Sequence, residues 1–198
     1  MTVAMIWPTA MSGSRANRLI FTTTLALTCL GSVAAAKPKY YVAIADVKHV
    51  ADETCKLETR ARALLERELA KHPAVLTRLG DPEPKGAALH KQLKARKLTG
   101  YAVILRITRC AHRLLPPRPG HAYKVLSVQV SVAIDAEKLP SSKMAAAGRG
   151  SAEVATEVSR VKPSELQSLR IEALDAAIDQ AASEFIKGLS GKKRKRRR

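Results

Sequence analysis

The hydrophobic positions beyond residue 36 change their spacing along the chain, and each change predicts a new element. Residues 40–47 form a compact apolar run, which predicts a buried strand. From Asp52 to about His72 the apolar residues recur at helical spacing, so we expect an amphipathic helix that Asp52 caps and Pro73 ends. The stripe that this helix would turn toward a core consists of Leu57, Ala61, Leu64, Leu65 and Leu69.

Two shorter elements are predicted next. Residues 74–79 favour a short strand, which Gly80 and Pro82 break. Residues 86–98 favour a second helix that ends before Gly100. Because helices connect the strands here, we expect parallel pairing in this half of the chain.

The spacing then changes to an alternation of two, which is typical of strands. Residues 101–110 predict a strand with Val103, Leu105 and Ile107 on one face, and a proline-rich loop over 114–120 follows. Residues 144–158 predict a less regular strand, in which we interpret Gly148-Arg149-Gly150-Ser151 as a turn or bulge. The segment between these two strands alternates in the same way, and its apolar residues are Leu126, Val128, Val130, Val132 and Ile134. Together the three strands predict an antiparallel meander.

A long helix is predicted last, with Pro163 before its N-cap Ser164 and its end at about Leu189. Ser164 and Gln167 form a capping-box pair, and Gly191 follows the helix. The predicted order is therefore β-α-β-α-β-β-β-α. It indicates one α/β (α+β-like) domain over residues 37–189, with helices packed on a mixed sheet.

Residues 1–36 have the pattern of a signal peptide. Arg15 and Arg18 precede an apolar stretch, and Ala34-Ala35-Ala36 closes it with small residues. We therefore expect an exported protein, periplasmic or secreted, with no transmembrane segment after cleavage. An uncleaved amino-terminal anchor and a start at Met11 are the alternatives.

The order of these elements resembles the small α/β module of bacterial envelope proteins. That module occurs in the amino-terminal domain of the Tol translocation protein and in the curli-secretion lipoproteins. Residues 42–47, 57–69, 101–107 and 126–134 are the matching pieces, within a resemblance that covers about residues 40–187. The resemblance implies an envelope-associated, non-catalytic role.

Charge adds a second feature. Lysine and arginine number 35 against 17 acidic residues, so the net charge is +18. A block of like charges repels itself, and we predict a disordered basic tail over residues 190–198 that contacts an anionic envelope surface or polymer. A purely solubilising tail is the alternative. Nucleic acid is a less favoured partner, because no aromatic residue is interleaved with the cations. The predicted polyanion-binding residues are Lys192, Lys193, Arg194, Lys195, Arg196, Arg197 and Arg198.

Chemical motifs are few. Asp46, Asp52 and Glu53 cluster where the first strand meets the first helix, and capping accounts for them without catalysis. A metal site would need Cys110, His112 and His121, three ligands without a fourth. We predict no catalytic residue, no metal and no cofactor.

Two cysteines remain beyond the signal peptide, Cys55 and Cys110. Export places them in an oxidising compartment, where lone thiols tend to pair. If the strands before Cys55 and at Cys110 are parallel neighbours, both residues reach one edge of the sheet. We therefore predict a disulfide between them, with two unrelated buried thiols as the alternative.

Together these features indicate an exported, non-enzymatic binding or assembly module of the cell envelope, which could also have a protein partner there. An envelope enzyme that acts on an anionic polymer and a basic nucleic-acid-binding protein are the alternative hypotheses.

Overall fold

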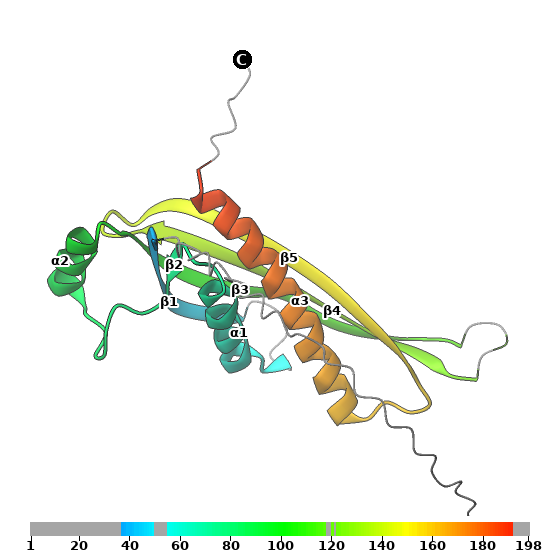
Figure 1. Ribbon diagram of the computed structural model, residues 1–198. Helices are drawn as coiled ribbons and strands as arrows, with labels where there is room; N and C mark the ends of the chain where they lie inside the picture. The colour runs from blue at the N-terminus through cyan, green and yellow to red at the C-terminus, as the bar shows by residue number, and fades with distance from the viewer. Residues whose placement is uncertain (1–36, 50–54, 118–119, 121, 192–198) are drawn as a thin grey trace, which may run out of the picture. The chain divides into compact units, whose positions relative to one another are not determined.

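The computed structural model describes residues 37–49, 55–117, 120 and 122–191, and its elements follow the predicted order. The strands form one sheet in the order β2-β1-β3-β4-β5 (Figure 1). β1 is parallel to β2 and β3, whereas β3, β4 and β5 pair antiparallel, so the predicted mixed sheet is confirmed. The bounds are β1 Tyr40–His49, α1 Glu58–Ala70, β2 Val75–Leu76, α2 Gly86–Arg96, β3 Thr99–Leu115, β4 Lys124–Lys138, β5 Lys143–Val158 and α3 Pro163–Leu189.

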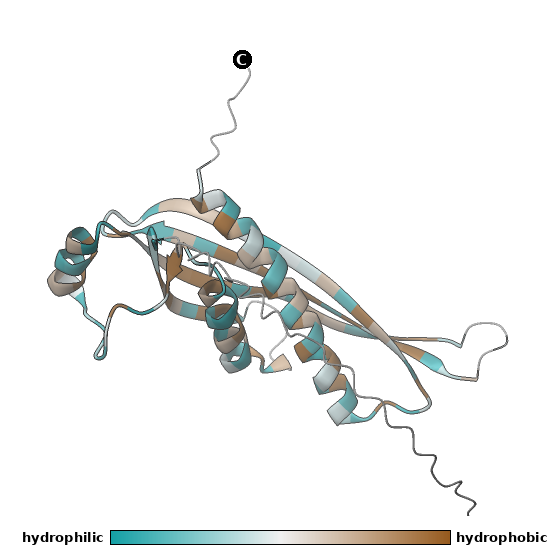
Figure 2. Cartoon of the chain, viewed as in Figure 1, coloured by the Kyte–Doolittle hydropathy of each residue, from teal (hydrophilic) through white to brown (hydrophobic). Residues whose placement is uncertain are grey.

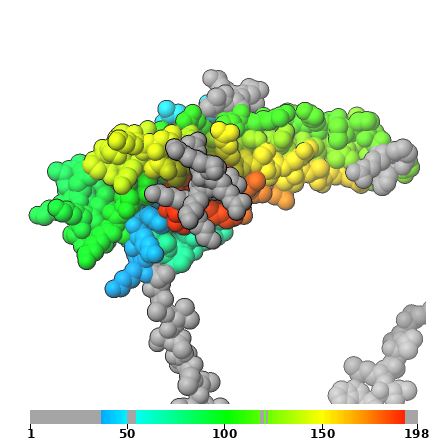
Figure 3. Space-filling view, turned by 90° about the horizontal axis from the view of Figure 1, so that it is seen from above, coloured from blue at the N-terminus to red at the C-terminus, as the bar shows by residue number. Residues whose placement is uncertain are grey.

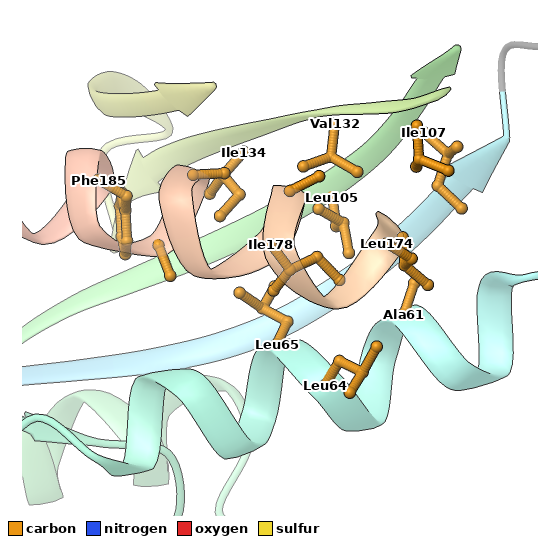
Figure 4. Packing of buried hydrophobic residues seen from close by; sticks show 14 of the residues in the cluster. Ala61, Leu64, Leu65, Leu105, Ile107, Val132, Ile134, Leu174, Ile178 and Phe185 are labelled. Atoms are coloured by element: carbon orange, nitrogen blue, oxygen red, sulfur yellow. The ribbon is translucent and has the colours of Figure 1, made fainter. Parts of the chain in front are cut away.

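The main core lies between the sheet and the two helices α1 and α3. The period-two positions of β4 are buried as predicted, with Leu126, Val128 and Ile134 fully inaccessible. Figure 2 shows this alternation as bands of hydrophobic and hydrophilic colour along the strands. Figure 4 shows side chains of the strands, α1 and α3 pointing toward one another. Burial of this apolar surface is the main term that stabilises the fold. The side chains labelled there are Ala61, Leu64, Leu65, Leu105, Ile107, Val132, Ile134, Leu174, Ile178 and Phe185.

The first half of the chain departs from prediction in its boundaries. α1 begins at Glu58 with Leu57 at the N-cap, so the predicted start at Asp52 is wrong, and Asp52 itself lies outside the described residues. The cause is burial before the helix, since Cys55 is 2% and Leu57 0% exposed. β2 is only two residues long, and β1 is buried chiefly at Tyr41 and Val42.

The start of α3 also differs from prediction. Lys162 occupies the N-cap in an extended conformation, and Pro163 is the first helical residue. Ser164 therefore lies inside the first turn, and the predicted capping box with Gln167 is wrong because no side chain caps this terminus. Proline suits the first helical position, where its missing N–H needs no partner.

The glycines of β5 correct a further prediction. Gly148 and Gly150 form neither a turn nor a bulge, because they pair in register with Ile134 and Val132 of β4. Both lie against the backbone of α3. A Cβ on Gly150 would lie 1.9 Å from the carbonyl oxygen of Ala177, and one on Gly148 would lie 2.1 Å from that of Ala181. The glycines therefore let the helix pack directly on the strand.

α2 covers the opposite face of the sheet at one end. Successive strand residues point to opposite faces, so Val42 joins the main core while Tyr41 packs with Leu79 and Leu93 in a second cluster. The Tyr41 hydroxyl donates to Glu83 at 2.8 Å. Burial raises the pKa of Tyr41, and the Glu83 carboxylate raises it further. This hydrogen bond fastens the segment before α2 to β1.

A buried carboxylate near the end of α1 is paired with two cations, one of which connects α1 to α3. Glu68 is 4% exposed, and its carboxylate lies 2.6 Å from Lys71 Nζ and 2.9 Å from Arg67 Nη2. Arg67 also reaches Asp175 of α3 at 2.5 Å. Burial by itself would raise the pKa of Glu68, but the hydrogen bonds and charges of Lys71 and Arg67 outweigh it and lower the pKa. The pairing keeps Glu68 ionised in the folded protein.

Candidate functional site

The predicted tail spans residues 190–198, and its seven cations, Lys192–Arg198, lie outside the described residues. The structure does describe the segment just before these cations. α3 ends at Leu189, and the Tyr40 hydroxyl donates to the Leu189 carbonyl oxygen at 3.0 Å. The Ser190 side chain donates to the carbonyl of Ile186 at 3.0 Å. The point at which the tail begins is thus fastened to β1.

Cys55 and Cys110 are joined by a disulfide, with Cα atoms 6.6 Å apart. The topology is the one on which the pairing was predicted. β1 and β3 are parallel neighbours with His49 opposite Ile107, so the residues beyond both positions meet at one end of the pair. The bond connects the segment just before α1 to the middle of β3.

Where the structure describes them, the candidate metal ligands and the acidic residues near the first helix do not form the sites considered for them. The sulfur of Cys110 is bonded to Cys55, so it is no free thiolate for a metal. His121 lies outside the described residues, and the described ones contain no cluster of three or more histidine, cysteine or acidic side chains that could hold a metal ion. Asp46 was expected to help cap the first helix, but it does not. It lies within β1, where its carboxylate accepts the amide of Val47 at 2.8 Å.

The sequence did not predict the most distinctive polar surface, which we call the open face. It is the side of β3, β4 and β5 turned away from α1 and α3, and it consists of cross-strand rows. One row is Arg106, Ala133 and Arg149, and the next is Arg109, Ser131 and Ser151. Small side chains thus form a floor between arginines. The two following rows are Ala111, Gln129 and Glu153, and Arg113, Ser127 and Ala155.

A hollow of about 660 Å³ lies on the open face near Arg106 and Arg149. Arg106 Nη2 pairs with Asp135 Oδ2 at 2.6 Å. The hydroxyls of Ser131 and Ser151 are hydrogen-bonded to each other at 2.8 Å. These contacts hold the floor and one wall of the hollow in place. Its lining side chains include Arg106, Thr108, Ser131, Ala133, Asp135, Arg149, Ser151 and Gln180.

The four rows of the open face carry four arginines and one glutamate, Glu153. Asp135 forms an ion pair with Arg106, and Glu153 accepts a short hydrogen bond from Ser127. Within the described part of the chain, the guanidinium groups of Arg109, Arg113 and Arg149 form no ion pair. Unpaired guanidinium groups over small side chains can receive carboxylate or phosphate groups with paired hydrogen bonds.

α3 supports the same hollow from the edge of the sheet. β5 is an edge strand, and its amides at Arg149 and Ser151 point away from β4. Glu184 accepts from the Arg149 amide at 2.7 Å, and Gln180 accepts from the Ser151 amide at 3.0 Å. Figure 3 shows α3, in orange and red, lying along the yellow β5. The backbone beneath Arg149 is therefore held on both sides.

Comparison with known proteins gives matches among solved structures only. No family model and no curated protein matches the sequence. A minor lipoprotein from Acinetobacter baumannii is similar, with 10% identity and a TM-score of 0.41 over 75% of this chain and 92% of that one. A Xanthomonas campestris protein of the family DUF330 gives 8% identity and a TM-score of 0.43 over 79% and 88%. PelC from Paraburkholderia phytofirmans gives 11% identity and a TM-score of 0.32 over 74% and 92%.

One of these three neighbours, the protein from Acinetobacter baumannii, is a lipoprotein. The particular resemblance to the Tol and curli-secretion proteins is not shown by them. Among the described residues, no helix is long and apolar enough to cross a bilayer.

Proposed function

We propose that the protein is an exported, non-enzymatic binding or assembly module of the cell envelope, held on anionic surfaces by residues Lys192–Arg198. The observation that carries the proposal is the run of seven cations that starts three residues beyond Leu189, the fastened end of α3. Each basic side chain near an anionic membrane contributes about 1 kcal/mol, so seven are enough to retain a protein at a surface. A protein partner in the envelope fits the same role.

The hydroxyls of the hollow support binding over catalysis. Ser131 and Ser151 hydrogen-bond to each other, so the hydroxyl contact seen in the structure is not with a basic side chain. A serine nucleophile needs an adjacent general base to be activated. Within the part of the chain that the structure describes, the Ser131–Ser151 pair therefore lacks the contact that would activate either hydroxyl as a nucleophile, and this supports a binding role for the hollow.

Removal of residues 192–198 should abolish most binding to anionic vesicles. We expect at least a 100-fold loss of affinity at low salt, because the tail carries seven cations and no part of the hydrophobic core. The remaining binding should depend less on salt. The measurement is co-sedimentation with phosphatidylglycerol vesicles over a series of salt concentrations, together with urea unfolding, which should be unchanged.

A full-length variant with all seven cations replaced by glutamine is the matched control, since it keeps the length of the tail. It should behave like the truncated protein. Equal vesicle binding by the parent and both variants would exclude the tail as a tether. Tight binding of duplex DNA that survives the truncation would instead favour the nucleic-acid-binding alternative.

Export should leave Lys37 as the first residue. Intact mass measurement on protein recovered from the periplasm or the medium checks this expectation, because the Ala34-Ala35-Ala36 motif lies immediately before Lys37. Changing Ala34 and Ala36 to bulky residues should block cleavage. Recovery of only full-length protein from the cytoplasm would reject both the signal peptide and the proposed location.

A further inference from the structure

The open face has a geometry suited to a ligand of its own, separate from the basic tail. Arg106 and Arg149 lie in one cross-strand row with Ala133 between them. Two strand spacings separate their Cα atoms by about 10 Å. The methyl group of Ala133 leaves the space between the two long side chains open, and this space is part of the 660 Å³ hollow. A group of a few atoms can therefore enter between the guanidinium groups.

Arg106 and Arg149 differ in the contacts that hold them in place. Arg106 is oriented by its ion pair with Asp135, at 2.6 Å. Arg149 has no ion pair within the described residues, while its backbone amide is fixed by Glu184 of α3. Arg149 thus offers a free, planar set of donors from a held backbone. A carboxylate fits such a fork with two parallel hydrogen bonds.

The remaining lining groups indicate what accompanies the anionic group. Asp135 places a carboxylate inside the hollow, which repels a densely charged phosphate but accepts hydrogen bonds from hydroxyl groups. Thr108, Ser131 and Ser151 add hydroxyls to the same lining. An acidic sugar brings a carboxylate together with several hydroxyls, so it satisfies both kinds of group.

We propose that this hollow binds a carboxylate-bearing carbohydrate chain, whose carboxylate is held by Arg149 beside Arg106. The unpaired guanidinium groups of Arg109 and Arg113 continue along β3 on the same face. A linear polymer with repeated carboxylates can follow them, which favours a chain over a single sugar. The open face, and not the tail, determines the chemical selectivity of the protein for this polymer.

The test is calorimetric titration of the full chain with tetragalacturonate, a short probe chosen to limit contacts with the tail. Arg149→Ser should weaken binding at least tenfold, and Arg149→Lys should recover only part of the loss because the paired hydrogen bonds are missing. Arg60→Ser is the matched control. Arg60 is an exposed residue of α1, which packs on the other face, so this variant has the same charge change and should stay within twofold of the parent.

Two further probes separate the ligand chemistries. The methyl ester of tetragalacturonate keeps the hydroxyls without the charge and should bind at least tenfold more weakly. Tetraphosphate should bind without dependence on Arg149. The proposal is overturned if the parent does not bind tetragalacturonate, if Arg60→Ser weakens binding as much as Arg149→Ser, or if tetraphosphate is preferred with the same Arg149 dependence. Failure here with intact vesicle binding would leave the role of the tail standing.

Discussion

Gly150→Ala should destabilise the protein by about 3 kcal/mol, the upper end of the usual cost of overpacking. The added methyl group would lie 1.9 Å from the carbonyl oxygen of Ala177 and 2.9 Å from the amide nitrogen of Ala181. These are helix backbone atoms, which cannot move aside as a flexible side chain can. α3 must shift as a whole, and Ile178 and Phe185 then lose contacts with the sheet.

The sign of this effect is diagnostic, because alanine in a strand without steric conflict would cost nothing or stabilise. Gly188→Ala is the matched control within α3. Its new Cβ would meet Ala146 at 3.6 Å, an ordinary contact, and alanine favours helix. We expect a gain of about 0.5 kcal/mol. Urea unfolding followed by circular dichroism checks both, and equal effects of the two substitutions would contradict the close contact of α3 with β5.

Loss of the Cys55–Cys110 bond should cost about 4 kcal/mol, because the bond closes a loop over a sequence separation of 55 residues in the unfolded chain. The cleanest measurement compares the same polypeptide with and without a reductant, since no atoms of the core are exchanged. The urea midpoint should fall on reduction.

The double variant Cys55→Ala with Cys110→Ala provides the control for this prediction. It should unfold near the midpoint of the reduced parent, and a reductant should leave it unchanged. Thiol titration of the unreduced, unfolded parent after cleavage of the signal peptide should detect no free thiol. Two free thiols, or a parent protein insensitive to the reductant, would contradict the bond.

Much of the fold could be predicted because the spacing of apolar residues reports which face of an element is buried. The alternation in β4 predicted both the strand and its buried side correctly, and the last helix was predicted to end where α3 ends. The start of α1 was missed because a good capping residue, Asp52, precedes a segment that is fixed by burial of Cys55 and Leu57. Local preference gave way there to tertiary packing.

The glycines and the open face show a different limit. The turn or bulge predicted at Gly148 and Gly150 was based on neighbouring residues alone. Glycine is needed at these positions because α3, about thirty residues further along the chain, packs directly against them. Arg106 and Arg149 share a row only because β3, β4 and β5 pair in one particular register. Irregularities in that register between Ile107 and Arg109 and between Ala136 and Glu137 cannot be read from the alternation of residues.

The two acceptors that α3 offers to β5 have a consequence for the behaviour of the molecule in concentrated surroundings. An edge strand with free amides is a template on which a neighbouring chain can add a strand. Gln180 and Glu184 occupy those amides at Ser151 and Arg149 only while α3 is in place. Any fluctuation that separates α3 from the sheet therefore exposes the apolar core and the unpaired amides of β5 at the same time. We therefore expect the packing of α3 to limit the addition of a foreign strand at the β5 edge.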